Sequence, residues 1–504
     1  MRRASPRCPS IRVTPPTSWF VGITSALAAI FIVLFPGSTQ AHIGEQNVVF
    51  EGMAGPYPLR VIIKAPNVVP GLAEISVRSL AAGVDAVKVL PLRWDVGRKG
   101  SPPPDKAKPI SGEPDLFSAQ LWLMTSGAYS VEVTATGSRG EHSLLVPVNS
   151  VATGRLGLPR WLGGALAVLG ILLVALLVSV ARAAAQESVL VPGEAPSPLH
   201  RRRGLGSALM ATLIVGLSLW GGKRWWKAEE NQYLTRMLFE PFQVGTSLET
   251  TNKQQVLRLA VDFSKGPSSF LRNVTPLIPD HGKLMHVFVV RTNGFDAMAH
   301  LHPVRVSPGA FTAALPPLPA GGYRLFADVT HESGFSHTMV GSFEIQQPTK
   351  PETFRPTDAD DAWSEPGLAK PTAFQIKLEG DGRFTSGEDA GIAIQAIGGD
   401  GKPVELEPYL GMLGHAFVMA EDGSVFSHLH PQGNGSMGAA IAFTRRELGT
   451  SAAQKLAEEI CAPLEPDRAL GFPYVFPKPG SYRLWVQAKA GGKVETGAFR
   501  IEVK

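Results

Sequence analysis

The sequence predicts an all-β protein, built from antiparallel β-sandwiches and joined to two transmembrane helices. Glycine and proline are abundant, at 53 and 42 residues. They separate short runs of β-branched and aromatic residues, which is typical of antiparallel sandwiches rather than of alternating βαβ units. Two long stretches without charged residues interrupt this pattern. At 504 residues the chain is long enough for about three or four domains of usual size.

A strand motif recurs three times, each time as a turn glycine followed by a tyrosine and an alternating strand. Its tyrosines are Tyr129, Tyr323 and Tyr482, and a second strand follows each at residues 146–148, 342–345 or 498–503. The motif resembles the last two strands of immunoglobulin-like (Ig-like) sandwiches, where a tyrosine ties down a corner. We therefore expect three Ig-like antiparallel β-sandwich modules, at residues 42–155, 245–347 and 373–504. Residues 348–372 are expected to form an exposed linker, and the third module to carry a helical insertion.

The amino terminus has the layout of a cleavable signal segment. Arginines precede an apolar run at residues 19–35, and small residues lead to Ala41, which predicts a signal peptide over residues 1–41. An uncut anchor helix is the alternative. Residues 161–181 and 204–222 are expected to be transmembrane helices, with a cytoplasmic loop at residues 182–203. This topology predicts a bacterial-type inner (cytoplasmic) membrane, with the modules facing the periplasm or exterior.

Net charge and cysteine content limit which partners and which cross-links the chain can have. The formal net charge is only +5, and the basic clusters flank apolar segments, which favours a membrane and argues against nucleic acid. Of the two cysteines, Cys8 lies in the signal segment, so the mature chain would retain Cys461 alone and form no internal disulfide. We interpret Cys461 as a packed helix residue, with a ligand or an intermolecular bridge as alternatives.

Histidines are concentrated in two similar places. Nine of the twelve lie between His281 and His430, and His-Leu-His-Pro occurs at residues 300–303 and 428–431. In the third module, Asp422-Gly423 indicates a two-residue type I′ hairpin turn. Counting back from this turn pairs Met419 with Phe426, Phe417 with His428 and His415 with His430. Opposed residues of an antiparallel pair share a face, so these three histidines should lie together.

The second module reaches the same arrangement with a longer loop. A three-residue bulged loop at residues 293–295 pairs His286 with His302, Phe288 with His300 and Val290 with Met298. Each module therefore has a candidate three-histidine metal site. The alternative is that His-Leu-His-Pro is a structural corner copied by duplication. The predicted ligands are His286, His300 and His302 in one site, and His415, His428 and His430 in the other.

Ligand chemistry favours copper, with zinc second. Neither triad contains a thiolate or a carboxylate, and imidazole with an occasional thioether suits copper. Weaker candidate ligands are His42, His142, His331, His337, Met298 and Met419. For His331 and His337 we favour surface polar positions, and His281 is of uncertain face. If the signal is cut after Ala41, the free amine and imidazole of His42 could chelate copper together with His142, although a histidine can follow a cleavage site by chance.

Export, Ig-like modules, an amino-terminal histidine and clustered His with Met resemble the periplasmic copper-handling proteins of the CopC-like and YtkA-like types. The resemblance is one of architecture over the three modules. It carries over one position, His42, because the mature CopC-like chain starts with a ligand histidine; the His-Leu-His-Pro units belong to neither pattern.

These observations lead to three hypotheses about function. The first is a membrane-anchored extracytoplasmic protein that binds or delivers copper, with another metal-handling protein or cuproprotein as partner. The second is an enzyme with a three-histidine metal, although Asp296 and Glu421, the nearest carboxylates in sequence, fall at the far hairpin ends. The third is a metal-free Ig-like structural or interaction module.

Overall fold

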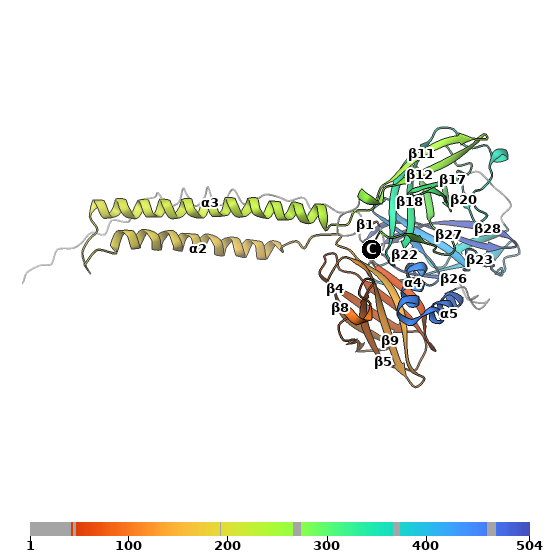
Figure 1. Cartoon of the computed structure of the whole chain (residues 1–504), viewed down its shortest axis with the longest axis horizontal. Coiled ribbons are helices and arrows are strands. Elements are labelled where there is room, and N and C mark those ends of the chain that lie inside the picture. The colour runs from red at the N-terminus through yellow and green to blue at the C-terminus, as the bar shows by residue number, and fades with distance from the viewer. Residues whose placement is uncertain (1–41, 44–46, 192, 266–273, 366–372, 461–469) are drawn as a thin grey trace, which may run out of the picture. The chain divides into compact units, whose positions relative to one another are not determined.

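The computed structural model describes residues 42–43, 47–191, 193–265, 274–365, 373–460 and 470–504, so the expected signal segment and Cys461 lie outside the described residues. The described part is mostly β, with strands in several sheets and four α-helices (Figure 1). Consecutive parts of the chain each supply two sheets, which we call the N-terminal, middle and C-terminal sheet pairs.

The N-terminal sheet pair combines a five-stranded sheet, in the order β2-β3-β4-β8-β7, with a four-stranded sheet, in the order β10-β9-β5-β6. Strands β3 and β4 alternate buried and less buried side chains, which is expected of a sheet with one face in a core. The strands are β2 (Asn47–Ala54), β3 (Tyr57–Lys64), β4 (Gly71–Ser79), β5 (Val84–Arg93), β6 (Asp105–Lys106), β7 (Lys108–Ile110), β8 (Glu113–Leu123), β9 (Gly127–Gly137) and β10 (Gly140–Ser150).

The middle sheet pair combines a four-stranded sheet, β11-β12-β17-β16, with a six-stranded sheet, β13-β18-β14-β15-β20, in which β19 also pairs with β18. The strands are β11 (Val244–Thr251), β12 (Gln254–Val261), β13 (Leu277–Ile278), β14 (His286–Arg291), β15 (Met298–Leu301), β16 (Val304–Ser307), β17 (Ala310–Ala314), β18 (Gly321–His331), β19 (Ser336–Ile345) and β20 (Ala362–Ser364). Strands β14 and β15 are buried on both faces, so each face of this hairpin contacts other protein.

The C-terminal sheet pair combines a three-stranded sheet, β21-β23-β26, with a six-stranded sheet, β1-β25-β24-β27-β28-β22. The strands are β21 (Phe374–Leu378), β22 (Arg383–Phe384), β23 (Asp389–Gly398), β24 (Gly414–Ala420), β25 (Val425–Leu429), β26 (Leu470–Val475), β27 (Gly480–Ala490) and β28 (Lys493–Val503), joined by β1 (His42–Ile43), which pairs in parallel with β25. Strands β24 and β25 are again buried on both faces.

The recurring tyrosine makes the same local contact in all three sheet pairs. Tyr323 donates to the carbonyl of Pro319 and Tyr482 to that of Lys478, both at 2.7 Å. The hydroxyl of Tyr129 lies 3.0 Å from that of Thr125, also four residues upstream. Each tyrosine therefore ties its strand to the preceding turn, as the motif predicts.

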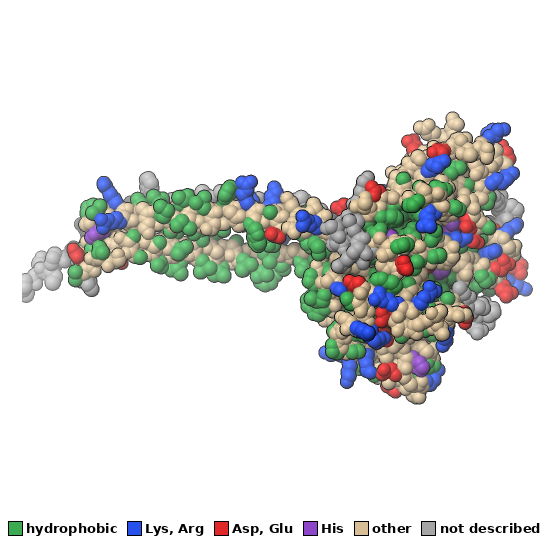
Figure 2. Space-filling view, viewed as in Figure 1, with side chains coloured by type: hydrophobic (Ala, Val, Ile, Leu, Met, Phe, Trp, Pro, Cys, Tyr) green, Lys and Arg blue, Asp and Glu red, His purple; other side chains and the backbone are tan. Residues whose placement is uncertain are grey.

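The two long helices contain the predicted membrane spans. Helices α2 (Arg160–Glu187) and α3 (Pro198–Arg236) are long and apolar enough to cross a membrane. Almost no residue in the most apolar stretch of either helix is buried. Hydrophobic side chains cover both helices in Figure 2. The helices extend beyond the expected spans, so the loop predicted over residues 182–203 is shorter and connects Glu187 to Pro198.

The segment expected to be an exposed linker is built into the middle sheet pair. Strand β20 pairs with β15, and Phe354, after the short 3-10 turn η4 (Pro351–Thr353), is only 8% exposed. Asp361 accepts a hydrogen bond from the backbone of His302 at 2.8 Å. The expectation of exposure was wrong for Phe354 and Ala362, which packing and edge pairing bury, whereas residues such as Arg355 and Pro356 are exposed and residues 366–372 lie outside the described part of the chain.

The helical insertion of the C-terminal sheet pair is present as α4 (Met437–Leu448) and α5 (Thr450–Ile460), separated by Gly449. It packs into the core of the N-terminal sheet pair, which includes Met437 and Leu456. Asn434, just before α4, accepts from the backbone N–H of Val49 at 2.7 Å. The insertion therefore joins different parts of the chain next to the histidine-bearing strand β25.

Candidate metal centre

Both predicted hairpin registers are present. In the middle sheet pair Phe288 pairs with His300 and Val290 with Met298. In the C-terminal sheet pair Phe417 pairs with His428 and Met419 with Phe426. The one-residue difference in spacing is thus absorbed by the loops. Because opposed residues share a face, the register brings the three predicted histidines of each hairpin together.

Both turns differ from their predictions in backbone conformation. The loop after β14 has two consecutive residues at positive φ, Gly294 and Phe295 (91° and 53°), whereas the expected bulged loop has one. In the other hairpin, Gly423 has φ 75° and donates to the carbonyl of Ala420, whereas Asp422 is not among the described residues with positive φ. The expected type I′ turn was therefore wrong, although the strand pairing that it implied is retained.

The two hairpin faces pack against each other instead of facing solvent separately. Their apolar halves form one cluster in which Phe288 contacts Phe417 at a ring-centroid distance of 4.8 Å, and which also contains Trp485. Met298 and Met419 belong to this apolar cluster. The histidine halves meet in the same way, because the ring centroids of His286 and His428 lie 5.2 Å apart. The two predicted sites therefore form one histidine cluster.

The rings are arranged alike in the two halves. We call His286, His300 and His302 the middle histidine group, and His415, His428 and His430 the C-terminal histidine group. Ring centroids are 5.4, 5.1 and 4.6 Å apart in the first group and 5.4, 5.1 and 4.3 Å apart in the second. All six rings are buried. Nitrogens of the whole C-terminal group lie within 4.8 Å of one another, and so do nitrogens of His286, His300 and His428.

On several of these rings, one nitrogen lies within hydrogen-bonding distance of an oxygen atom. His286 donates through Nε2 to the carbonyl of Asp280 at 3.0 Å, and His300 through Nδ1 to Oε1 of Gln487 at 3.0 Å. Nδ1 of His302 lies 3.2 Å from Oδ1 of Asp361. An oxygen acceptor on one ring nitrogen fixes the tautomer and leaves the other nitrogen free to bind a metal, as in most protein metal sites.

The surroundings keep the rings neutral. Burial, with the neighbouring His281, lowers the pKa of His286 to about 4. Burial, with His286, lowers the pKa of His302 to about 2. The pKa values of the other four rings are also lowered, chiefly by burial and then by neighbouring histidines. Neutral imidazole is the form that binds metal ions.

Two bare nitrogens face each other in the middle group. Nδ1 of His286 lies 3.1 Å from Nε2 of His300. Because each ring already uses its proton on Asp280 or Gln487, a hydrogen bond between them would need an additional proton and a buried imidazolium. Nδ1 of His415 lies 3.2 Å from Nε2 of His428, but Nε2 of His415 has no described partner, so a proton on Nδ1 of His415 can bridge this second pair. Such distances are within the span of two nitrogens bound at ~2.0–2.1 Å to one ion.

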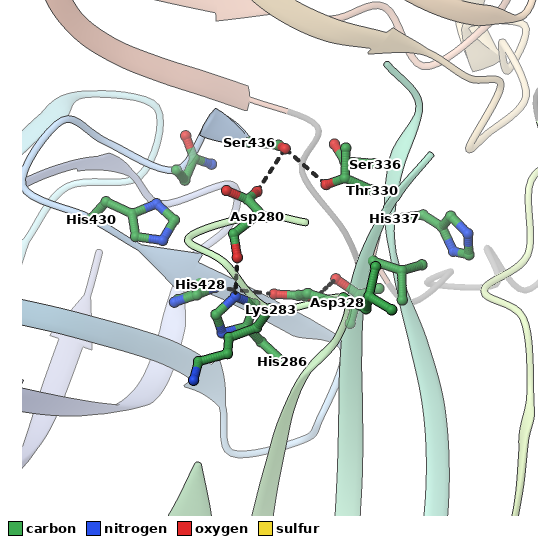
Figure 3. Close-up of a pocket in the computed structure, with 14 residues that line it drawn as sticks. Asp280, Lys283, His286, Asp328, Thr330, Ser336, His337, His428, His430 and Ser436 are labelled. Carbon is green, nitrogen blue, oxygen red and sulfur yellow. Dashed lines mark hydrogen bonds and ion pairs between the residues drawn. The ribbon is translucent and has the colours of Figure 1, made fainter. Parts of the chain in front are cut away.

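Further nitrogens are buried without a hydrogen-bond partner among the described residues. They are Nε2 of His302, Nε2 of His415 and both ring nitrogens of His430. Of these residues, His430 lines a cavity of about 40 Å³, together with Asp280, His286, Asp328 and His428 among others (Figure 3). Buried polar atoms normally have partners, so unpartnered buried nitrogens indicate a ligand.

Sequence reasoning did not assign several residues of this region to a site. The buried side chain of His281 has its ring centroid 4.5 Å from that of His430, Asp328 lies 3.5 Å from Nδ1 of His428, and Asp280 lines the cavity; Gln487 and Asp361 were not assigned either. A signal for His281 existed. Residues 279–286 (PDHGKLMH) share proline, glycine, leucine and histidine with residues 408–415 (PYLGMLGH) at the same spacing. Asp328 carried no signal, because only strand pairing places it opposite His286.

The remaining predicted ligands lie elsewhere. His331 and His337 are buried at 0% and 8% exposure, so the expectation of surface positions was wrong. Their Nε2 atoms are 3.1 Å apart, and Phe242 and Phe263 pack around them. His142 is bonded to the carbonyl of Arg139 at 3.1 Å and contacts Tyr57. The backbone of His42 pairs with Val425 in β1.

Two parts of the chain match one family. The family model is described as "Domain of unknown function (DUF8832)" and matches residues 242–347 and 370–504. These segments contain both histidine hairpins. No curated protein matches the chain.

Solved structures with detectable similarity include the BSP domain of a biofilm-associated protein, at 8% identity and a TM-score of 0.14, covering 95% of this chain and 69% of that one. An ICAM-5 D1–D4 ectodomain fragment is similar at 9% identity and a TM-score of 0.15, with coverage of 89% and 83%. Escherichia coli alpha-2-macroglobulin is similar at 8% identity and a TM-score of 0.19, with coverage of 88% and 44%.

Proposed function

We propose that this chain is a membrane-anchored extracytoplasmic protein that binds copper in its histidine cluster and passes it to a partner protein. The observation that carries this proposal is the pair of bare nitrogens on His286 and His300, 3.1 Å apart. Their rings are neutral and their tautomers are fixed by Asp280 and Gln487. With Oε1 of Gln487 as the acceptor, a bound cation relieves the repulsion between two facing lone pairs, and burial disfavours a proton in its place.

The donor set supports copper before zinc. Imidazole nitrogens make up both groups, whereas calcium and magnesium require six or more oxygen ligands, and the carboxylates that lie beside the cluster are Asp280, Asp328 and Asp361. Copper binds imidazole sites more tightly than zinc does. More imidazoles are present than one ion needs, so an ion can change ligands stepwise, which suits delivery.

The proposed architecture places this cluster outside the cytoplasm. Three Ig-like modules are carried on a hairpin of two transmembrane helices, α2 and α3, and a signal segment at residues 1–41 exports the first module. The two candidate spans support the anchor. Protease accessibility of the sheet pairs in sealed spheroplasts tests this topology; protection of the middle sheet pair would contradict it.

The metal content of the full chain, purified in detergent and incubated with Cu²⁺ or Zn²⁺, tests the proposal. We expect about two equivalents of copper, lost together in a variant with His300→Gln and His428→Gln. His200→Gln is the matched control, because His200 lies in helix α3, outside the cluster, and is not a candidate ligand. A wild-type protein that stays free of both metals would overturn the proposal.

A metal-dependent hydrolase is the second candidate, and Asp328 favours it. A catalytic metal site needs a group that manages protons. Asp328 lines the cavity next to His428, and burial raises the pKa of its carboxyl to about 7 despite a hydrogen bond from Thr338. Zinc-dependent hydrolysis of an activated ester that falls in Asp328→Asn, with zinc still bound, would support this role.

A further inference from the structure

A tight turn of the same form precedes the first histidine strand in both hairpins. In the middle sheet pair Asp280 and Lys283 exchange two backbone hydrogen bonds of 2.9 and 3.0 Å, around His281 and Gly282 at positive φ. In the C-terminal sheet pair Tyr409 and Met412 do the same around Leu410 and Gly411. Leu410 has φ 54° and His281 has φ 50°. The turn itself therefore does not require histidine.

His281 points into the other half of the centre. Its ring centroid is 4.5 Å from that of His430 and 5.3 Å from that of His415, but 6.2 Å from that of His286. With 5.1 Å between His415 and His430, the three rings are spaced as in each histidine group. His281, although carried by the middle sheet pair, is thus closer to the C-terminal group.

All three of these rings carry unpartnered nitrogens. Nε2 of His281, Nε2 of His415 and both nitrogens of His430 are buried without a hydrogen-bond partner among the described residues. Nε2 of His281 lies 3.4 Å from Oδ1 of Asp280, an approach that does not form a hydrogen bond. Three rings therefore present buried nitrogens that no described protein group satisfies, and this observation is independent of the facing pairs on His286 and His415.

The helical insertion holds the turn that carries His281. At the start of α4, Asp280 accepts a hydrogen bond from the hydroxyl of Ser436 at 2.8 Å (Figure 3). It also accepts one from the backbone N–H of Gly438 at 3.1 Å. A Cβ on Gly438 would lie 3.0 Å from the carbonyl oxygen of Pro279, so a glycine permits this close approach. The C-terminal sheet pair thus fixes a histidine of the middle one against its own histidine group.

We propose that His281 is a further metal ligand, supplied by the middle sheet pair to the position formed by the C-terminal histidine group. This inference rests on the proposed function and refines it. The two metal positions are then unequal: the one at the C-terminal group has an additional imidazole, whereas the equivalent turn contributes Leu410. A fourth nitrogen suits Cu²⁺, which favours tetragonal nitrogen sites. Metal bound there also fastens the two sheet pairs together.

Cu²⁺ titration of the full chain in detergent, with wild type and His281→Leu compared by chelator competition and electron paramagnetic resonance, tests this assignment. Leucine is the residue that the equivalent turn carries, so the metal-free variant should have the same melting temperature as the metal-free wild type. We expect one of two bound Cu²⁺ ions to bind at least about tenfold more weakly, since even outer residues of metal sites have effects of 10–100-fold. One of two spectral components should change.

His200→Leu, at a histidine of helix α3 outside the cluster, should leave both affinities and the spectrum unchanged. If leucine lowers the melting temperature of the metal-free protein, His281→Asn takes its place, because asparagine accepts positive φ. Two Cu²⁺ bound with wild-type affinities and spectrum in the folded variant would overturn the role of His281 alone. A wild type that binds no Cu²⁺ would instead overturn the proposed function.

Discussion

Asp328 and Gln487 occupy equivalent positions, and each contacts a histidine of the opposite sheet pair. Asp328 pairs with His286 across β18 and β14, and Gln487 pairs with His415 across β27 and β24. Asp328 lies 3.5 Å from Nδ1 of His428, whereas Gln487 lies 3.0 Å from Nδ1 of His300. Each histidine group is therefore contacted by the sheet that carries the other group. The carboxylate of Asp328 contacts His428, and the amide of Gln487 contacts His300.

Exchanging these orienting groups should alter metal affinity. We expect Asp328→Asn and Gln487→Leu each to weaken copper binding about ten- to hundredfold, because residues that orient ligands have effects of this size. Competition titration with a chromophoric chelator measures the change. Asp328→Gln, which installs the amide of the equivalent position, should have the smaller effect. Wild-type affinity in both Asp328→Asn and Gln487→Leu would contradict the orienting role.

The metal-free protein should lose stability in mild acid. An unfolded histidine has a pKa near 6.5, whereas the pKa of His286 is about 4 in the fold. Between these two pKa values the unfolded chain binds a proton that the folded protein does not. The free energy of unfolding is therefore highest above pH 6.5 and declines as the pH falls towards 4. One such ring corresponds to about 3 kcal/mol. Thermal unfolding followed by circular dichroism between pH 7.5 and 4.5 should show this decline; a midpoint independent of pH would contradict it.

The apolar half of the paired hairpins should contribute strongly to stability. Phe288 is fully buried and contacts Phe417 and Phe426 across the two faces. Phe288→Ala leaves a cavity and should cost about 3–5 kcal/mol. The measurement is the thermal midpoint of the metal-free protein. Trp122→Ala, at a residue that is 56% exposed, is the control and should change it little.

Metal removal should loosen the junction between the middle and C-terminal sheet pairs. An ion that binds only the folded state stabilises it by about 2.7 kcal/mol at a free concentration 100 times its Kd. Treatment with a chelator should therefore lower the melting temperature and speed proteolysis near β20, which pairs at the edge beside His300. If copper changes neither the melting temperature nor the rate of proteolysis near β20, the ion does not join the two sheet pairs.

The sequence by itself determined the local geometry of the candidate centre. Period-two alternation and loop length pair Phe288 with His300 and Phe417 with His428, because a one-residue slip would move every side chain to the opposite face. The tyrosine corners and the two apolar helices follow from equally local patterns.

Only the tertiary structure decided that the two histidine faces meet. Whether a face of a sheet contacts solvent or another face depends on residues that are distant in the chain, and apolar alternation looks the same in both cases. The contact between the rings of Phe288 and Phe417, and the hydrogen bonds from the start of α4 to Asp280, join segments more than 100 residues apart. Burial of six imidazoles in one cluster, with His281 beside them, follows from that packing and not from either hairpin alone.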